Sequence, residues 1–325
     1  MRKSLLQIYG DLKESDSTSE YPYLLGNTIH KELLARFNGF ASPWRQFVKI
    51  GNLSDFKAHD RIILSEAPDL LKITDQDGYK GSKISDAKYS LQADTWGRSF
   101  AVTRRQVIND DLGGILQMPG LYGRAAIRTL VKQVIEFLKG GKNTYDGKVL
   151  FHVSHNNYVD TALANTAAGA AAISAAIAKI EGAKEPNSNE PMGIKAKYIL
   201  TGVTLGGIVQ QLIKSAQLLP VSTNGGGTYN NIGHLIPLVD PLIDDNLSST
   251  WWAVLADPAD CPVVEVGFLN GQDTPELLVQ KPTFVSVVGG GDDPYGYDFD
   301  DLNYKTRWDF GVQLAYYQGI CRGKE

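Results

Sequence analysis

The most regular hydrophobic pattern of the chain lies near its C-terminal end, where every second residue from 304 to 316 is apolar, aromatic or threonine. Successive side chains of a strand point to opposite faces, so this alternation predicts one long strand with a single buried face. About 13 residues is roughly twice the usual strand length. We therefore expect the strand to run along another long element, and the helix predicted at 120–139 is the obvious partner. The predicted buried face consists of Tyr304, Thr306, Trp308, Phe310, Val312, Leu314 and Tyr316.

That helix is predicted from apolar residues that recur at helical spacing between 127 and 138. Pro119 suits its first turn, and Gly140-Gly141 is typical of a helix end. At about 1.5 Å per residue, about 20 residues form a rod of roughly 30 Å. The apolar stripe consists of Ile127, Leu130, Val131, Val134, Ile135 and Leu138.

An extended hairpin is predicted between Arg61 and Val102. Ile62-Ile63-Leu64 begins it, and in the returning stretch Tyr89, Leu91, Ala93 and Thr95 alternate with polar residues. Asp77-Gly78 and Lys80-Gly81 supply turn residues that tolerate a positive φ. The tip is long, polar and rich in lysine, so we expect it to lie outside the core of its own subunit.

The segment 160–262 alternates predicted helices and strands and indicates a compact α+β body. Helices are predicted at 167–184 and 205–213, and strands at 198–200, 235–239, 251–255 and, just beyond it, 263–268, with Asp-Pro turns at 240–241 and 257–258. By contrast, residues 1–45 are polar with one short helical stretch at 29–36. Such a segment is typical of an arm that is ordered by what it lies against.

Composition and charge exclude several classes of protein. The 325 residues are 43% hydrophobic and 21% charged, as in ordinary globular chains. No apolar run approaches about 18 residues and the N-terminus lacks a signal-peptide core, so we expect no membrane span and no export. A net charge of −4 without a Lys/Arg block disfavours sequence-reading nucleic-acid binding. The two cysteines, Cys261 and Cys321, are expected to be free thiols.

The strongest candidate for chemistry is His152-Val153-Ser154-His155. If 149–153 is a strand, the two imidazoles point to opposite faces, and the sequence offers no adjacent carboxylate or cysteine to complete a metal site. The Gly-rich stretches 224–228 and 289–291 match no phosphate-binding motif, and the acidic stretch 292–301 departs from the calcium-loop spacing. We therefore assign no catalytic, cofactor-binding or metal residue. The alternative is a hydrolase or small-ligand binding protein with a site near His152–His155.

The order of these parts, together with six stretches of sequence, resembles the major capsid proteins of tailed phages. Taken singly each stretch is weak, but their order and spacing over about residues 95–325 are most similar to the Mu-like major head subunit group and its Hong Kong 97-type capsid fold. The stretches are 102–113, 155–157, 236–241, 252–258, 265–272 and 304–312.

The resemblance implies an α+β fold with an N-terminal arm, an extended E-loop hairpin, a long spine helix, and peripheral and axial domains. It places the arm at 1–45, the E-loop and flanking strands at 46–111, the spine helix and first peripheral part at 112–160, the axial domain at 161–262 and the returning peripheral strands at 263–325. The E-loop itself falls at 61–99 and the spine helix at 118–140. Expected assembly contacts at the E-loop tip are Asp77, Gly78, Lys80, Gly81 and Lys83.

The resemblance further implies self-assembly into hexamers and pentamers of an icosahedral shell that encloses double-stranded DNA without reading its sequence. Residues 1–45 are too short and lack the heptads of a fused scaffold, so a separate scaffold protein is expected. A portal and decoration proteins would be further partners. The expected location is the virion, after assembly in the cytoplasm of a bacterial host, with no membrane and no cofactor. Some relatives cross-link their subunits through a lysine, but nothing in the sequence identifies a partner for Lys80, Lys83 or Lys88.

Overall fold

The structure is a computed structural model. It describes residues 21–64, 70, 72, 81, 86–103, 105–106, 109, 117–186, 189–215, 217–218, 228–280, 284–285, 292–293 and 301–324. The chain divides into two compact units. The first comprises 1–41, 94–130 and 272–310, and the second comprises 42–93, 131–271 and 311–325.

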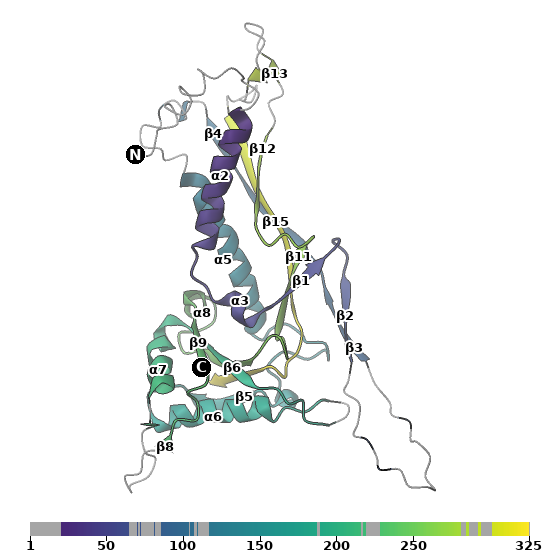
Figure 1. Cartoon of the computed structure of the whole chain (residues 1–325), viewed down its shortest axis with the longest axis vertical. Coiled ribbons are helices and arrows are strands. Elements are labelled where there is room, and N and C mark those ends of the chain that lie inside the picture. The colour runs from purple at the N-terminus through teal and green to yellow at the C-terminus, as the bar shows by residue number, and fades with distance from the viewer. Residues whose placement is uncertain are drawn as a thin grey trace. The chain divides into compact units, whose positions relative to one another are not determined.

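Two helices of the first unit cross closely. They are α2 (Tyr21–Asn38) and the first half of α5 (Met118–Leu138), and Figure 1 shows them side by side. A Cβ atom at Gly123 would overlap the Leu33 carbonyl oxygen, so the crossing requires glycine at that position. The predicted long helix is confirmed, whereas α2 begins well before the short helix predicted at 29–36.

The remaining part of the first unit is built around the long strand β15 (Asp301–Leu314), whose last four residues belong to the second unit. Tyr304, Thr306, Trp308 and Phe310 are buried, which confirms the alternation, while Val312 is only partly buried. The short strand β12 (Glu276–Val279) pairs antiparallel with β15.

The long element that hydrogen-bonds along β15 is another strand. Strand β4 (Asp94–Thr103) pairs antiparallel with it over ten residue pairs, from Asp301↔Thr103 to Phe310↔Asp94. Helix α5 packs on the same two strands: Tyr122 stacks on Phe100 of β4 at 4.6 Å between ring centroids, and Met118 packs against the cluster of Val102 and Tyr304. The hydrogen-bonded partner of β15 is therefore β4, and the predicted helix contacts the pair through its first turns. The alternation expected from Tyr89 to Thr95 also ends early, because Thr95 is exposed on β4.

The second unit carries the predicted hairpin and its support. Strand β1 (Lys49–Leu53) follows the short helix α3 (Trp44–Phe47) and pairs parallel with β11 (Val264–Leu269), which neighbours β15. The hairpin consists of β2 (His59–Leu64) and β3 (Asp86–Leu91), paired antiparallel over six residue pairs. The hairpin is confirmed, but it ends at Leu91. The rest of the segment predicted as E-loop, from 94 to 99, belongs to β4.

A second sheet in the same unit has the order β5-β16-β10-β6-β9. Its strands are β5 (Tyr158–Ala162), β16 (Ile320–Lys324), β10 (Trp252–Ala256), β6 (Ala196–Thr201) and β9 (Ile236–Val239). Thus β16 lies in the sheet of the predicted α+β body, although the sequence analysis grouped it with the returning strands.

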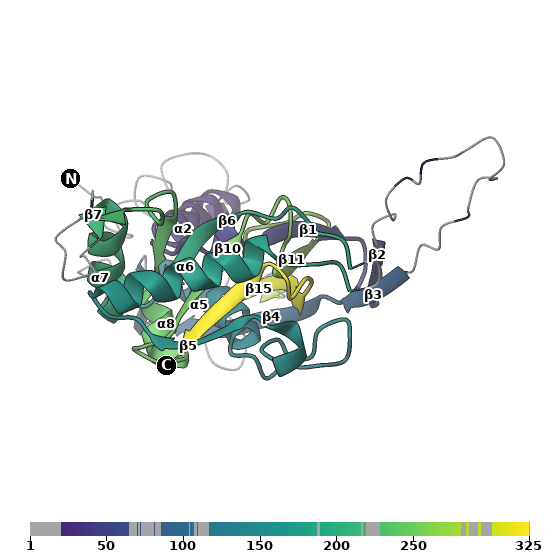
Figure 2. The same cartoon turned by 90° about the horizontal axis from the view of Figure 1, so that it is seen from below.

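Three helices accompany this sheet: α6 (Ala167–Glu181), α7 (Val203–Lys214) and α8 (Pro241–Asn246). Figure 2 shows α6 lying along the sheet, and its apolar residues share one core with those of α7, β6 and β10. The thiols of Cys261 and Cys321 are buried in that core and unpaired. Asp240 was predicted to form a turn with Pro241, but its side chain instead accepts from the Leu242 N–H and caps α8.

The remaining described elements are short. They are a single 3₁₀ turn, η2 (Val153–His155), and the paired strands β7 (Gln217–Leu218), β8 (Thr228–Tyr229), β13 (Phe284–Val285) and β14 (Asp292–Asp293). The Gly-rich stretches 224–228 and 289–291 lie mainly or wholly outside the described residues. No helix in the described part of the chain is both long and apolar enough to cross a membrane.

Candidate assembly surface and polar loop

The inward face of the β2–β3 hairpin is built for contact with its own subunit. Odd-numbered residues of both strands point inward, and Ile63, Tyr89 and Leu91 are buried. Ile63 and Tyr89 pack with Ala315, which follows β15. Leu91 packs with Leu53 of β1 and with Ala93. The apolar positions of the inward face therefore fix the base of the hairpin on β1 and on the residue that follows β15.

A buried carboxylate in β11 holds both strands of the hairpin. The Glu265 side chain is 2% exposed, and it accepts a hydrogen bond from the Tyr89 hydroxyl of β3. Its Oε1 lies 3.2 Å from Arg61 Nε of β2, and its Oε2 lies 4.0 Å from Lys49 Nζ of β1. Arg61 Nη2 also donates to the Asn52 carbonyl oxygen at 3.0 Å. We call these four side chains, Glu265, Tyr89, Arg61 and Lys49, the Glu265 hub.

The electrostatics of the hub follow from its burial. Burial, followed by the hydrogen bond and negative charge of Glu265, raises the pKa of Tyr89, so its hydroxyl remains a donor at every physiological pH. A buried carboxylate without partners would cost several kcal/mol, on the order of 3–5. Two cations and one hydroxyl offset that cost here. Leaving Glu265 unpaired is thus unfavourable, which favours the hairpin in this position.

The outward face of the hairpin is different, because two of its large apolar side chains have no cover within the subunit. Ile62 and Leu64 are each 68% exposed. Their strand neighbours are polar: Lys88 Nζ lies 2.7 Å from Asp60 Oδ2, and the Ser90 hydroxyl also donates to Asp60. Leu70, beyond the end of β2, is fully exposed. Exposed apolar residues rimmed by charges are typical of a surface that meets another protein.

Of the five predicted contact residues at the hairpin tip, only Gly81 lies among the described residues. It is exposed, and a Cβ atom there would meet nothing within 4 Å. Asp77, Gly78, Lys80 and Lys83 lie outside the described residues, so their roles stay predictions. Sequence reasoning missed the Glu265 hub. The available signal was a single acidic residue inside the otherwise apolar strand Val263–Phe268.

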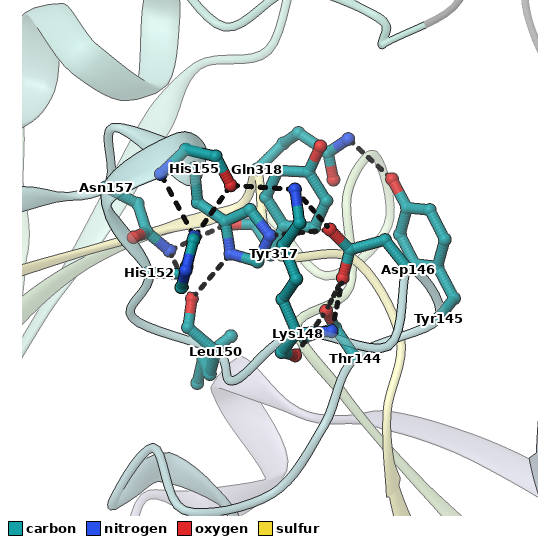
Figure 3. A network of polar contacts seen from close by, with 11 residues as sticks. Thr144, Tyr145, Asp146, Lys148, Leu150, His152, His155, Asn157, Tyr317 and Gln318 are labelled. Atoms are coloured by element: carbon teal, nitrogen blue, oxygen red, sulfur yellow. Dashed lines mark hydrogen bonds and ion pairs between the residues drawn. The ribbon is translucent and has the colours of Figure 1, made fainter.

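The second candidate site is the loop that contains both histidines of the HVSH stretch. Figure 3 shows His155 between Asp146 and Leu150, with the Tyr317 ring beside it. The imidazole stacks on Tyr317 with ring centroids 3.8 Å apart, and its side chain is 1% exposed. Nδ1 lies 3.0 Å from the Leu150 carbonyl oxygen, and Nε2 lies 2.8 Å from Asp146 Oδ2. Neither ring nitrogen is left for a substrate or a metal ion.

Asp146 is the anionic partner in this loop. Burial alone would raise its pKa, but hydrogen bonds from the Thr144 hydroxyl, from His155 and from the Lys148 N–H outweigh it and lower the pKa to about 2. A carbonyl and an ionised carboxylate only accept hydrogen bonds. Each ring nitrogen of His155 therefore faces an acceptor, the Leu150 carbonyl oxygen on one side and the Asp146 carboxylate on the other.

The other histidine behaves differently from the prediction. The strand expected at 149–153 does not form, because Val149 makes only an isolated bridge to Asn143 and Val153 begins the 3₁₀ turn η2. The two imidazole centroids therefore lie 5.8 Å apart instead of on opposite faces. His152 Nδ1 caps this turn by accepting from the Ser154 N–H at 3.1 Å. The expected lack of a nearby carboxylate was also wrong, because folding brings Asp146 to His155. Both histidines thus hold the turn by hydrogen bonds.

The chemistry available in this loop is limited. The Ser154 hydroxyl lies 2.9 Å from Lys148 Nζ and 2.8 Å from His152 Nδ1, on an exposed surface. Asn157 donates to the Leu150 carbonyl oxygen at 2.9 Å, and its backbone carbonyl accepts from the Arg322 N–H at 3.0 Å. Nowhere among the described residues do three His, Cys, Asp or Glu side chains gather as metal ligands. The contacts tie the loop to the C-terminal residues 317–322.

Comparison with known proteins relates the chain to a protein family and to solved structures. A model of the phage capsid protein family matches residues 88–323, well over half of the chain. A search of curated proteins gave no match. Solved structures are similar in fold over most of their length. A chain from Microbacterium phage Oxtober96 has a TM-score of 0.55 at 12% identity, with 88% of this chain and 92% of that chain covered.

Two further solved structures extend the comparison. One is a virus-like particle from Pyrococcus furiosus, with a TM-score of 0.52, 13% identity, and 92% and 99% of the two chains covered. The other is the capsid of an empty GTA particle, with a TM-score of 0.55, 10% identity, and 87% and 89% covered. Identities this low show the fold alone. The fold is thus the α+β capsid fold expected from the sequence.

These findings define a structural protein of virus shells. The chain belongs to the phage capsid protein family and is a major capsid protein, a component of the virion that assembles with copies of itself into a shell. The resemblance to tailed-phage capsid proteins is thereby confirmed. The finer assignment to the Mu-like group is not tested by these matches and stays a prediction.

Proposed function

We propose that this capsid protein assembles into hexamers and pentamers of an icosahedral shell that encloses double-stranded DNA without reading its sequence. The observation that carries the proposal, beyond family membership, is the two-faced hairpin. Its inward face is fixed on its own subunit by buried apolar residues and the Glu265 hub, while Ile62 and Leu64 on the outward face have no cover. Apolar residues that a subunit leaves uncovered are buried when a neighbouring copy packs on them.

The proposal gives each segment of the chain a role. The arm is 1–45, and α2 supplies a helix within it. The hairpin region at 46–111 makes contacts between subunits, with Asp77, Gly78, Lys80, Gly81 and Lys83 at its tip. The spine helix region is 112–160, the axial domain 161–262 and the returning peripheral strands 263–325, with β16 joining the axial sheet. A separate scaffold protein, a portal and decoration proteins complete the particle, which is assembled in the host cytoplasm.

The test replaces the uncovered apolar residues with charged ones. The double variant Ile62→Asp/Leu64→Asp should leave the subunit folded, because both side chains are exposed. It should abolish shells, because two carboxylates would have to be buried between copies. The full chain is expressed with and without its scaffold, and negative-stain microscopy and sedimentation score capsomers and closed shells. Circular dichroism and the thermal midpoint establish the fold.

A matched control introduces the same charges at exposed apolar residues outside the hairpin. Val153 is 94% exposed and Val203 is 57% exposed. Val153→Asp/Val203→Asp should assemble as the unmodified chain does. Normal shells from the hairpin variant would refute the role of the hairpin, and a chain that stays monomeric under every condition would refute the shell itself.

A further inference from the structure

Helix α5 presents a continuous solvent-facing stripe. Its exposed residues recur every three or four positions, as expected for the outer side of a helix whose other side is buried. Large side chains such as Leu130, Val134 and Leu138 fill the buried side. The stripe consists of Leu121, Arg124, Arg128, Lys132, Glu136 and, directly after the helix, Lys139.

This stripe is basic although the whole chain carries a net charge of −4. Arg124, Arg128 and Lys132 are four residues apart, so their Cα atoms advance about 6 Å along the helix at each step. Among the residues that the structure describes, no carboxylate lies within ion-pair distance of any of these three side chains. We call Arg124, Arg128 and Lys132 the basic row.

A fourth cation stands at one end of the row. Arg36 of α2 covers Gly120, where a Cβ atom would lie 2.7 Å from Arg36 Cγ, and Gly120 is one turn before Arg124. Arg36 shares its charge with Glu32, since Nε and Oε1 are 3.2 Å apart. It therefore extends the row weakly, and the three unpaired cations dominate its potential.

We propose that the basic row binds the phosphate backbone of double-stranded DNA, independently of sequence. The inference rests on the proposed function, which supplies DNA as the enclosed polyanion. Guanidinium groups bind phosphate oxygens with two parallel hydrogen bonds, and each cation that neutralises a phosphate releases counterions. Three unpaired cations in a line suit a linear polyanion.

An acidic protein segment is a poorer fit for the same row. Protein interfaces have an apolar core inside a polar rim. The only large exposed apolar residue of α5 is Leu121, at the end of the stripe, and from Arg124 to Lys139 its outer positions are all charged. A partner held there gains little from apolar burial, so charge must supply the binding.

The row predicts weak binding that depends strongly on salt. Three phosphate contacts give a slope of log K against log salt concentration of about −2.7, from about −0.9 per phosphate. A single subunit then binds DNA weakly, whereas many copies in one shell act together through their high local concentration.

The experiment measures fluorescence anisotropy of a labelled random-sequence duplex of about 30 base pairs with the purified full chain before assembly, from about 20 to 200 mM salt. Arg124→Gln/Arg128→Gln should bind at least about tenfold more weakly at low salt, with the slope reduced in size by about 1.8. Lys184→Gln/Lys195→Gln removes two charges from exposed positions elsewhere and should behave as the unmodified chain. Circular dichroism checks that each variant is folded.

Each outcome of this experiment either supports or overturns DNA binding by the basic row. Equal losses in both double variants, or no change in salt slope on removing Arg124 and Arg128, would overturn the proposal. A polyglutamate chain that binds more tightly than DNA and depends on the same arginines would assign the row to an acidic protein segment instead. If the double variant does not fold, Lys132→Gln alone should reduce the slope by about 0.9. Negative-stain microscopy of the same samples tests shell formation separately, so loss of DNA binding with intact shells leaves the proposed function standing.

Discussion

The second sheet and the β2–β3 hairpin lie in the same unit and are stabilised in opposite ways. The sheet buries almost every residue of β6 and β10 between layers, with Trp252 fully buried at its centre. The hairpin buries one face only and depends on the Glu265 hub. Apolar burial has no preferred direction, whereas ion pairs and hydrogen bonds fix a geometry. The sheet thus supplies stability, and the hub supplies the orientation of the element that we propose contacts another subunit.

The largest effect should come from the sheet. Trp252→Ala removes a fully buried indole that packs against Gly323 of β16, where a Cβ atom would overlap the ring. We expect a loss of about 3–5 kcal/mol in the free energy of unfolding. Urea titration of the full chain followed by circular dichroism measures it. Val203→Ala, at an exposed position, should cost far less, and equal losses in both would contradict the assignment of stability to this core.

Loss of the hub should be smaller overall but concentrated in the hairpin. Glu265→Ala leaves Tyr89 without its acceptor and Arg61 without its ion-pair partner, and should cost about 2–3 kcal/mol. Hydrogen exchange measured by mass spectrometry should show faster exchange in 59–64 and 86–91, while β6 and β10 keep their protection. Glu265→Gln retains an acceptor for Tyr89, so its stability and its hydrogen exchange should lie between those of Glu265→Ala and the unmodified chain. Uniform deprotection of the whole unit in Glu265→Ala would refute a separate hairpin anchor.

The polar loop should respond to acid. The pKa of Asp146, about 2, lies below the ordinary value of 3.8, so the carboxylate stabilises the fold above about pH 4. That contribution is lost as the pH falls toward 2. Allowing for solvent screening, it amounts to about 1 kcal/mol. Urea titrations at a series of pH values should show a shallower decline between pH 4 and 2 for Asp146→Asn, and an unchanged slope would refute the stabilising role of Asp146.

The smallest effect should come from the outward face of the hairpin. Lys88→Gln breaks the exposed ion pair with Asp60, and we expect no measurable change in the urea midpoint at physiological salt. A clear loss would mean that the outward face also contributes to the stability of the subunit.

Regular elements with a strong period could be predicted from the sequence. The burial of Tyr304, Trp308 and Phe310 and the long helix α5 followed from spacing alone. The pairing of β15 with β4 could not be predicted, because β4 shows little alternation. Of its ten residues only Val102 is buried. Glycine is required at position 97 because a Cβ atom there would lie 2.7 Å from the Thr306 carbonyl oxygen.

The polar sites were harder to predict because their residues meet only through tertiary contacts. Asp146 and His155 are nine residues apart and meet only because a loop and the η2 turn bring them together. The Glu265 hub joins residues from β1, β2, β3 and β11, which no local pattern connects. Glu265 itself could have been noticed as a lone acid in a buried strand, but its partners come from tertiary pairing. Order and spacing of motifs nevertheless sufficed to indicate the capsid family.

The two buried cysteines have a practical consequence. Burial raises the pKa of both thiols to about 12, so almost no thiolate is present near neutral pH. Maleimide reagents, which attack the thiolate, should therefore leave Cys261 and Cys321 unlabelled in the folded chain. A single cysteine introduced at the exposed position Gly81 could then carry a fluorophore alone. Its emission would report when the hairpin tip becomes covered, which follows assembly in real time without any further mutation.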